Sequence, residues 1–247
     1  MNPESLLEEV IVAHGGRERW RSVTAIEFSL QSAGFAFASH GQPSALRGLK
    51  VRVLPHQRIV QLRDYCRPGW SGEWSPHYVA MRNRDGALVS ERHEPRTEFR
   101  GIVKNLVWDK LDILYFAGYA LWNYLSFPFV LAESGVKLAA PGSVDPGSGL
   151  RLAVEFPASL PTHSARQLFH FDEKRLLTRH DYTADVIGKW ATAANCILAS
   201  EVVDGLRFYT RRKVYPRMGA RQTVWPFPLL VWIEIDDLAV HFAESTG

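Results

Sequence analysis

The sequence SARQLFHFDEKRLLTRHDYTADV, residues 164–186, decides the fold class because it has the pattern of a β-hairpin. Apolar and polar residues alternate on both sides of Glu173–Lys174, and this period of two is typical of strands with one buried face. A two-residue turn at Glu173–Lys174 predicts four cross-strand pairs: Phe171 with Leu176, Phe169 with Thr178, Gln167 with His180, and Ala165 with Tyr182. The inward face then carries Phe171, Leu176, Phe169, Thr178, Gln167, His180, Tyr182 and His163. We expect this face to be apolar near the turn and polar farther along.

The outward face of the predicted hairpin is expected to be solvated. It carries His170 and Arg179, together with two pairs of opposite charge: Arg166 with Asp181, and Asp172 with Arg175. Because strand side chains alternate, Asp181 is expected to point away from its neighbour His180. We therefore do not predict a catalytic His–Asp dyad at this position.

Further hairpin signals occur on both sides of this segment. Asp85–Gly86 and Asp204–Gly205 stand between alternating runs, and Pro55 marks another turn. These patterns predict a mainly β protein with helices (α+β), whose nine to eleven strands form a strongly curved antiparallel sheet or half-barrel. We expect a single domain over residues 1–247, with Ala140–Gly149 as a surface loop.

One helix is expected at the N-terminus. Ser5 and Glu8 have the spacing of a capping box, and apolar residues follow with helical spacing. Gly15–Gly16 is expected to end this helix, since helices commonly end on glycine.

A second helix is predicted from about Trp108 to Leu125, within the most aromatic part of the chain. Asp109 and Asp112 fall in its first turns, where the helix dipole favours acidic side chains, and Pro128 prevents its continuation. These acids, the polar residues and the proline argue against a membrane span.

Three rings of this helix share one face. Tyr115, Tyr119 and Trp122 stand at positions i, i+4 and i+7. Such a face either packs as core or forms the wall of a ligand cavity, in which flat rings contact the ligand and polar tips orient it. The helix is expected to cover the curved sheet as a lid.

The composition excludes several classes of function. The formal net charge is +3 and the basic residues are scattered, so a nucleic-acid-binding face is not expected. Cys66 and Cys196 form no paired motif, and the N-terminus lacks the pattern of a signal peptide, so we expect a cytoplasmic protein without disulfides. No Walker or dinucleotide motif occurs, and we expect no cofactor.

Short motifs carry a resemblance to a known family. The leading helix with AHGGRERW (residues 13–20), the hairpin FHFDEKRLLTRHDY (169–182) and VVDGLRFYTRRKV (202–214) resemble bacterial lipoprotein-sorting carriers of the LolA/LolB type. This resemblance implies a curved antiparallel half-barrel whose concave face is covered by helices. It also implies the carriage of an apolar cargo.

Two functions are compatible with these residues. The first is a cofactor-independent enzyme that acts on a hydrophobic small molecule by proton transfer, as a cyclase, isomerase, dehydratase or lyase. The second is a non-catalytic carrier or sensor of an apolar ligand. A third possibility is that the polar groups are satisfied core residues in a filled scaffold.

In the enzyme hypothesis, His180 is the general acid or base, Tyr182 donates to an oxyanion, and His163 transfers or orients a second proton. The substrate-binding residues are then Gln167, Tyr115, Tyr119, Trp122 and Phe169. The predicted register separates His163 from His180 by roughly 13 Å, so a shared metal is not expected.

Two other pairs are weaker candidates. Trp70 and Trp74 either form the mouth of a cavity or cover the core. Arg211 and Arg212 point to opposite faces of one strand, so that one of them is able to face inward.

Overall fold

The computed structural model describes residues 2–99, 104, 106–139, 150–219 and 222–243. Within these residues the helices are α1 (Pro3–Ala13), α2 (Arg17–Arg21), α3 (Phe35–Ala38), η1 (Pro95–Phe99), α4 (Lys110–Ser126) and η2 (Phe129–Ala132). The first strands are β1 (Val23–Ala33), β2 (Leu46–Leu54), β3 (Ile59–Arg63), β4 (Ser71–Ser75), β5 (Tyr78–Arg82), β6 (Leu88–His93) and β7 (Lys137–Ala139). The others are β8 (Leu150–Glu155), β9 (Arg166–Phe171), β10 (Leu177–Thr183), β11 (Thr192–Val203), β12 (Leu206–Met218), β13 (Thr223–Val224) and β14 (Val231–Phe242).

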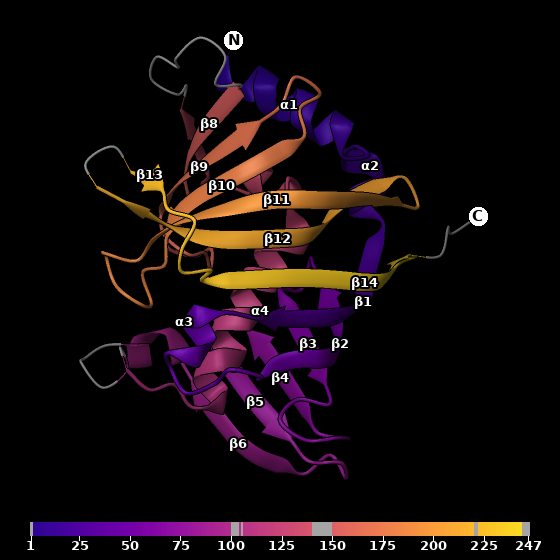
Figure 1. Ribbon diagram of the computed structural model, residues 1–247. Helices are drawn as coiled ribbons and strands as arrows, with labels where there is room; N and C mark the ends of the chain where they lie inside the picture. Colours follow the sequence, from indigo (N-terminus) through magenta and orange to yellow (C-terminus); the bar gives the residue numbers. More distant parts are fainter. Residues whose placement is uncertain (1, 100–103, 105, 140–149, 220–221, 244–247) are drawn as a thin grey trace.

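The strands form one continuous antiparallel sheet that curves around α4 (Figure 1). Its order is β6-β5-β4-β3-β2-β1-β14-β12-β11-β10-β9-β8-β7, and β13 pairs with β12. The last strand, β14, joins the two halves by pairing with both β1 and β12. The predicted fold class is confirmed, and the described residues form fourteen strands rather than the nine to eleven expected.

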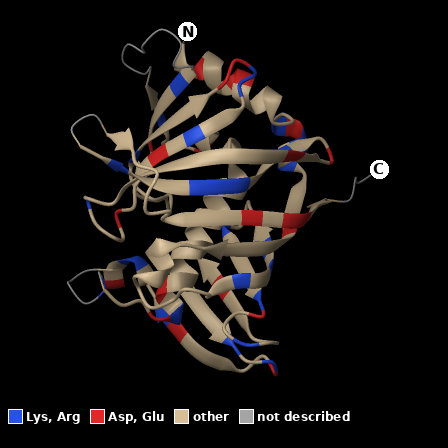
Figure 2. Cartoon of the chain, in the orientation of Figure 1, with Lys and Arg blue, Asp and Glu red and all other residues tan. Residues whose placement is uncertain are grey.

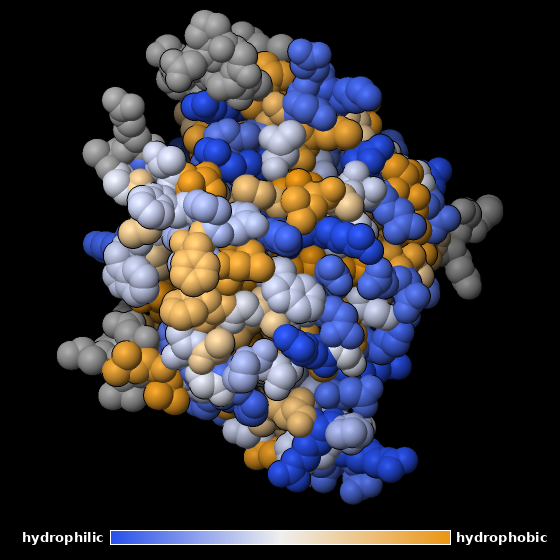
Figure 3. Space-filling view, viewed as in Figure 1, coloured by the Kyte–Doolittle hydropathy of each residue, from blue (hydrophilic) through white to orange (hydrophobic). Residues whose placement is uncertain are grey.

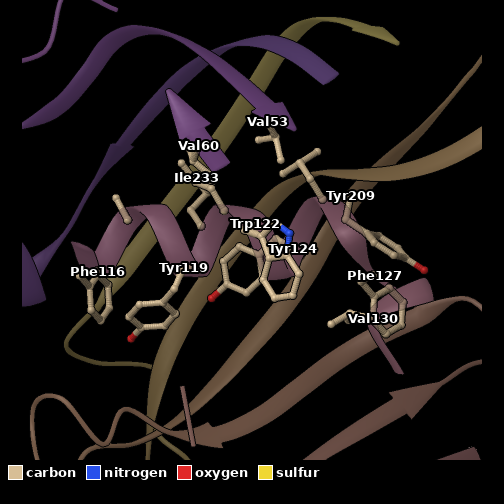
Figure 4. Close-up of a cluster of buried hydrophobic side chains, with 14 of the residues drawn as sticks. Val53, Val60, Phe116, Tyr119, Trp122, Tyr124, Phe127, Val130, Tyr209 and Ile233 are labelled. Carbon is tan, nitrogen blue, oxygen red and sulfur yellow. The ribbon is translucent and has the colours of Figure 1, made fainter. Parts of the chain in front are cut away.

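The helix α4 lies on the concave side of the sheet and has no exposed face. A reciprocal capping box between Asp109 and Asp112 starts it, as the acids in the first turn indicated. Every side chain from Leu111 to Ser126 is buried, and the helix packs against β3, β4, β5 and β12. Figure 4 shows its aromatic side chains among residues of the surrounding strands. Among the described residues, no helix is long and apolar enough to cross a membrane.

The N-terminal helix begins earlier than its sequence predicted. Asn2, rather than Ser5, caps α1, and its side chain accepts a hydrogen bond from the amide of Glu4. Pro3 sets the first helical backbone angle, which fits proline at that position. The capping box of Ser5 and Glu8 is therefore wrong, whereas the end of the helix at Gly15, where φ is +106°, is confirmed.

In the orientation of Figures 2 and 3, charged and apolar residues are mixed over the molecule. In Figure 2, short basic and acidic segments are scattered among uncharged residues over both halves of the sheet. In Figure 3, hydrophilic residues separate several smaller apolar groups. The predicted loop Ala140–Gly149 lies outside the described residues.

The hairpin of β9 and β10 has a different register from the predicted one. The pairs are Phe171 with Leu177, His170 with Arg179, Phe169 with His180, and Leu168 with Asp181. The loop is longer because Arg175 adopts a positive φ of 65°, while Asp172 accepts hydrogen bonds from the amides of Lys174 and Leu176. A bulge between Leu177 and Arg179 adds a second shift.

The two shifts have opposite consequences at the two ends of the hairpin. Near the turn, the predicted inward positions of Leu176 and Thr178 are wrong, because Leu177 is buried and Thr178 is exposed. Beyond the bulge, the shifts add up to two residues, which restores the predicted face. Gln167, Phe169, His180 and Tyr182 are therefore all buried on the inner side.

The outward face of the hairpin is not simply solvated. Asp181 is 2% exposed, and its Oδ2 binds His170 at 2.9 Å, Arg179 at 2.8 Å and Arg217 at 2.8 Å. The predicted pairs of Arg166 with Asp181 and of Asp172 with Arg175 are wrong. The shifted register instead places Arg166 near Glu155, and Arg175 near Glu9. The absence of a His180–Asp181 dyad is confirmed, since these residues bind partners on opposite faces.

Candidate functional site

His163 lies at the centre of a buried network of aromatic and polar side chains. Its Nδ1 is 3.1 Å from the hydroxyl of Tyr119, and its Nε2 is 2.9 Å from the hydroxyl of Tyr124. Its ring stacks on Tyr182 with a centroid separation of 3.8 Å. The hydroxyls of Tyr124 and Tyr182 are 3.3 Å apart. The lid helix and the β-hairpin therefore meet at this imidazole.

His180 forms the second half of the network. Its Nε2 is 2.5 Å from Oε1 of Gln167, and the amide nitrogen of Gln167 donates to the carbonyl of Ser164 at 2.7 Å. The His180 ring stacks on Phe169 at 4.2 Å. Gln167 thus fixes the orientation of His180 without contact with solvent.

The two imidazole rings are closer than the sequence indicated. Their centroids are 6.5 Å apart, so the predicted separation of roughly 13 Å is wrong. The chain before β9 does not continue as a straight strand, because it contains Pro157 and Pro161 and passes beside the end of β10, where the amide of Asp185 donates to the carbonyl of His163. No cluster of three metal-ligand side chains is found in the part of the chain that the structure describes.

Burial sets the electrostatics of this network. Loss of solvation lowers the pKa of His180 to about 3 and holds the pKa of His163 well below its usual range. The same effect raises the pKa of Tyr119, Tyr124 and Tyr182 above their usual values. At neutral pH the network is therefore uncharged, with hydrogen bonds shared between phenol and imidazole groups.

The structure keeps Tyr115 and Tyr119 together, with ring centroids 5.4 Å apart, and separates Trp122 from them. Tyr119 joins the network of His163, whereas the indole nitrogen of Trp122 donates to the carbonyl of Pro55 at 2.9 Å in the other half of the sheet. Tyr115 is 1% exposed and reaches the edge of a surface cleft. Of the predicted substrate-binding residues, Tyr115 alone lines this cleft.

The cleft has a volume of about 530 Å³ and lies between η1 and the segment that connects β8 to β9. Its apolar wall contains Phe99, Phe156, Pro157, Leu160, Pro161 and Val186. Its polar lining includes Arg96, His77, Glu94, Thr97, Thr162 and Asp185. No sequence pattern predicts this cleft, because its walls include short irregular segments without a periodic pattern.

Arg96 connects the cleft to the buried network. Its Nη1 donates to the carbonyl of Thr162 at 3.0 Å and lies 3.4 Å from the hydroxyl of Tyr115. The guanidinium carbon lies 5.8 Å from the ring centroid of Tyr119. No local sequence pattern marks this arginine, since η1 and α4 are brought together by the folded sheet.

Arg212 is the inward member of the arginine pair. It is 2% exposed, and its guanidinium lies 4.3 Å from the ring centroid of Tyr124. It forms no ion pair with a described residue, and burial lowers its pKa to about 10. With His180 and Gln167, it lines an enclosed cavity of only about 10 Å³, enough for roughly one water molecule.

Of the two alternatives for Trp70 and Trp74, the structure favours a place in the core for Trp74 and a cavity mouth for neither. Trp74 is fully buried and packs against α4, so it is a core residue. Trp70 is covered by Arg67, whose guanidinium lies 4.9 Å from its ring centroid. Neither tryptophan lines the cleft.

Comparison with solved structures places this architecture among known folds. A DUF1329 family protein from Desulfovibrio piger aligns with a TM-score of 0.51 at 13% identity, covering 100% of this chain and 96% of that chain. A LolA superfamily protein from Nitrosomonas europaea aligns with a TM-score of 0.52 at 11% identity, covering 98% and 95%. An outer membrane lipoprotein-sorting protein domain from Vibrio parahaemolyticus aligns with a TM-score of 0.52 at 10% identity, covering 97% and 94%.

Sequence comparison adds nothing further, since no protein-family profile and no curated protein matches the chain. At identities of 10–13% the likeness to solved structures concerns the fold. The resemblance drawn from the sequence is thereby confirmed at that level. The chain has a curved antiparallel half-barrel fold like that of these three solved structures.

Proposed function

We propose that this protein is a non-catalytic binding protein or carrier for a hydrophobic small molecule. The cleft of about 530 Å³ carries this proposal, because small-molecule sites have volumes of about 300–1,000 Å³ and mainly apolar walls with a few polar groups. Phe156, Leu160 and Val186 supply such a wall, and each is at most 5% exposed.

The comparisons support a carrier in preference to an enzyme. The similar structure from Vibrio parahaemolyticus is described as a lipoprotein-sorting domain, which is a transport role. The fold shared with that domain offers a concave sheet covered by a helix. We extend the binding role, and not the identity of the cargo, to this chain.

The space beneath α4 argues for the cleft as the binding site. Side chains of the helix fill the concavity, and the cavities that they line among the described residues have volumes of about 30 Å³ and 10 Å³. Neither volume holds more than one or two water molecules. A bound molecule of drug or lipid size therefore fits the cleft and not the space under the helix.

Substitutions that fill the cleft test this proposal. Thr97 and Ala158 line it and are exposed, so Thr97→Trp and Ala158→Trp should obstruct it without disturbing the core. Leu198→Trp, at an exposed position of β11 outside the cleft, is the matched control. Binding is measured by titration with the neutral fluorescent dye Nile red and by native mass spectrometry of co-purified molecules.

Both cleft variants should lose dye binding and any co-purified mass, while the control should keep them. Circular dichroism and thermal melting establish that all three variants are folded. If both cleft variants bind the dye as the wild type does, the cleft is not the binding site.

Proton-transfer catalysis is a second proposal, favoured by the proximity of His163, His180 and Tyr182. The ring centroids of His180 and Tyr182 are 4.9 Å apart, and both imidazoles are neutral at the pH where a general base operates. The protein groups around His163 use both of its nitrogens, so a substrate would have to displace Tyr119 or Tyr124.

The variants His180→Ala and Tyr182→Phe test this second proposal. If a co-purified molecule is identified and is converted by the wild type, both variants should abolish its turnover while keeping its binding. Unchanged turnover in folded variants would exclude acid–base catalysis by these residues.

A further inference from the structure

Charged side chains are unevenly distributed in the lining of the cleft. Arg96 is the cationic side chain of the lining, and it belongs to η1. It rests on two fully buried rings, Tyr115 and Tyr119, and therefore lies at the floor. The acidic residues Glu94 and Asp185 are exposed and lie at the rim.

Arg96 has donors that the described protein groups do not use. A guanidinium carries five N–H groups, and Nη1 alone forms hydrogen bonds, with Thr162 and Tyr115. No carboxylate of the described residues forms an ion pair with Arg96, and at the rim Glu94 pairs with His77 at 3.0 Å. Asp185 attracts Arg96 electrostatically without forming an ion pair with it, so the remaining N–H groups of the guanidinium are available to an anionic ligand.

The apolar residues of the cleft define the rest of the molecule. Phe99 and Phe156 are buried beside it, as are Leu160 and Val186. A chain or ring system of low polarity would pack against the small exposed edges of these side chains and against the other apolar residues of the lining. The volume of about 530 Å³ accommodates a long alkyl chain or a molecule of similar size.

We infer that the ligand is an anionic amphiphile with a carboxylate, which binds the guanidinium of Arg96 while its apolar part lies against Phe156, Leu160 and Val186. A carboxylate matches the planar fork of a guanidinium and can accept two parallel hydrogen bonds. Arg96 supplies one positive charge, and the carboxylates of Glu94 and Asp185 repel a doubly charged phosphate more strongly than a singly charged carboxylate. This inference rests on the proposed binding function and names its ligand class.

The test compares an ionised fatty acid with its uncharged ester. The probes are cis-parinaric acid and its methyl ester, whose fluorescence reports binding directly, at about pH 8.5, where the carboxylate is ionised. Wild-type protein should bind the acid about tenfold more tightly than the ester, which is the range of one charge-assisted hydrogen-bonded pair.

Three variants identify the group responsible. Arg96→Gln should reduce the ratio of the two affinities to about one while leaving ester binding unchanged. Arg96→Lys should keep part of the preference, because it keeps the charge without the planar fork. Arg67→Gln, which removes an equal charge outside the cleft, should leave the ratio unchanged.

A fourth variant tests the acids at the rim. Asp185→Asn removes from the entrance a negative charge that repels the carboxylate of the probe. It should raise the affinity for the acid about twofold, without affecting the affinity for the ester.

The outcomes separate the two proposals. If neither probe binds the wild type, the proposed function fails. If both bind equally, or if Arg96→Gln leaves the ratio unchanged, the protein binds apolar molecules but the inferred head group is wrong.

Discussion

Gly118 of α4 lies directly against the indole ring of Trp74 in β4. A Cβ atom placed on Gly118 would be 2.2 Å from Cγ and 2.4 Å from Cβ of Trp74, far inside van der Waals contact. Trp74 has no exposed surface, and its ring lies 6.4 Å from that of Trp122 on the same helix. The glycine therefore sets how closely the helix approaches the sheet.

We expect Gly118→Ala to destabilise the protein by about 2 kcal/mol, because the added methyl group overpacks a rigid contact. This outcome opposes helix propensity, which alone favours alanine by about 1 kcal/mol. The double variant with Trp74→Leu should lose less stability than the sum of the two single changes. Additive losses in urea denaturation would mean that the two residues do not share this contact.

The buried carboxylate of Asp181 should be essential for stability. Burial alone would raise its pKa, but hydrogen bonds from His170 and Arg179 outweigh burial and lower the pKa below its usual value. Asp181→Asn leaves Arg179 and Arg217 without a counter-charge and should cost about 3 kcal/mol. Asp237→Asn, at an exposed ion pair, should leave stability nearly unchanged. Equal effects of the two changes in urea denaturation would contradict this assignment.

Arg212 should have the opposite effect on stability. It is buried without an anionic partner among the described residues, and burial already disfavours its charge. We expect Arg212→Met to raise the free energy of unfolding by about 1 kcal/mol, because an apolar chain of similar length removes the desolvation cost. Arg211→Met, at the exposed neighbour, should leave stability nearly unchanged. A loss of 2 kcal/mol or more in Arg212→Met would show that its contacts with Tyr124 outweigh desolvation.

Stability should fall as the solution is acidified below neutral pH, and His14 should account for part of that fall. Its Nδ1–H donates to the carbonyl of Val10 at 2.6 Å and its Nε2 accepts from Tyr209 at 2.7 Å, so the folded state holds it neutral. Burial lowers its pKa to about 4, whereas an unfolded histidine titrates near 6.5. The stabilisation is thus present above about pH 6.5 and is lost as the pH falls toward 4.

Between pH 7.5 and 5.5, this one group should contribute about 1.3 kcal/mol of lost stability. In His14→Gln, the difference in unfolding free energy between these two pH values should shrink by that amount. His93→Gln, at an exposed position, is the control and should keep the full difference. Urea denaturation at both pH values gives the measurement. An undiminished pH effect in His14→Gln would show that His14 is not the titrating group.

The turns that contain glycine could be predicted from the sequence. Gly86 and Gly205 have φ values of +81° and +76°. Residues with a Cβ atom rarely adopt such values, so the Asp-Gly pair in the sequence indicates the position of both loops. The β9–β10 loop could not be predicted, because Arg175 adopts φ +65° without any such mark. Its longer loop and the following bulge depend on the capping by Asp172 and on packing against α1, through the contact of Arg175 with Glu9.

The part of the candidate site that lies on the β9–β10 hairpin could be predicted, because the alternation of side chains along a strand determines its face. Alternation alone placed Gln167, His180 and Tyr182 on one face, and two compensating shifts preserved that result. The cleft required the meeting of η1 with the β8–β9 connection, which are more than 50 residues apart. A contact between segments so far apart leaves no pattern in either segment, so the residues next to Arg96 in the sequence do not indicate that it lines a cleft.

Because every side chain of α4 from Leu111 to Ser126 is buried, the size of these side chains sets how much empty space remains inside the sheet. The helix has 17 residues and is about 25 Å long, and the sheet wraps around it. Replacing its large aromatic side chains by smaller ones would create interior space without altering any strand. A cavity left by one large side chain stays dry when its walls are apolar. Redesign of the side chains of α4 alone should therefore change which ligands fit inside the sheet, while the strands keep their sequence.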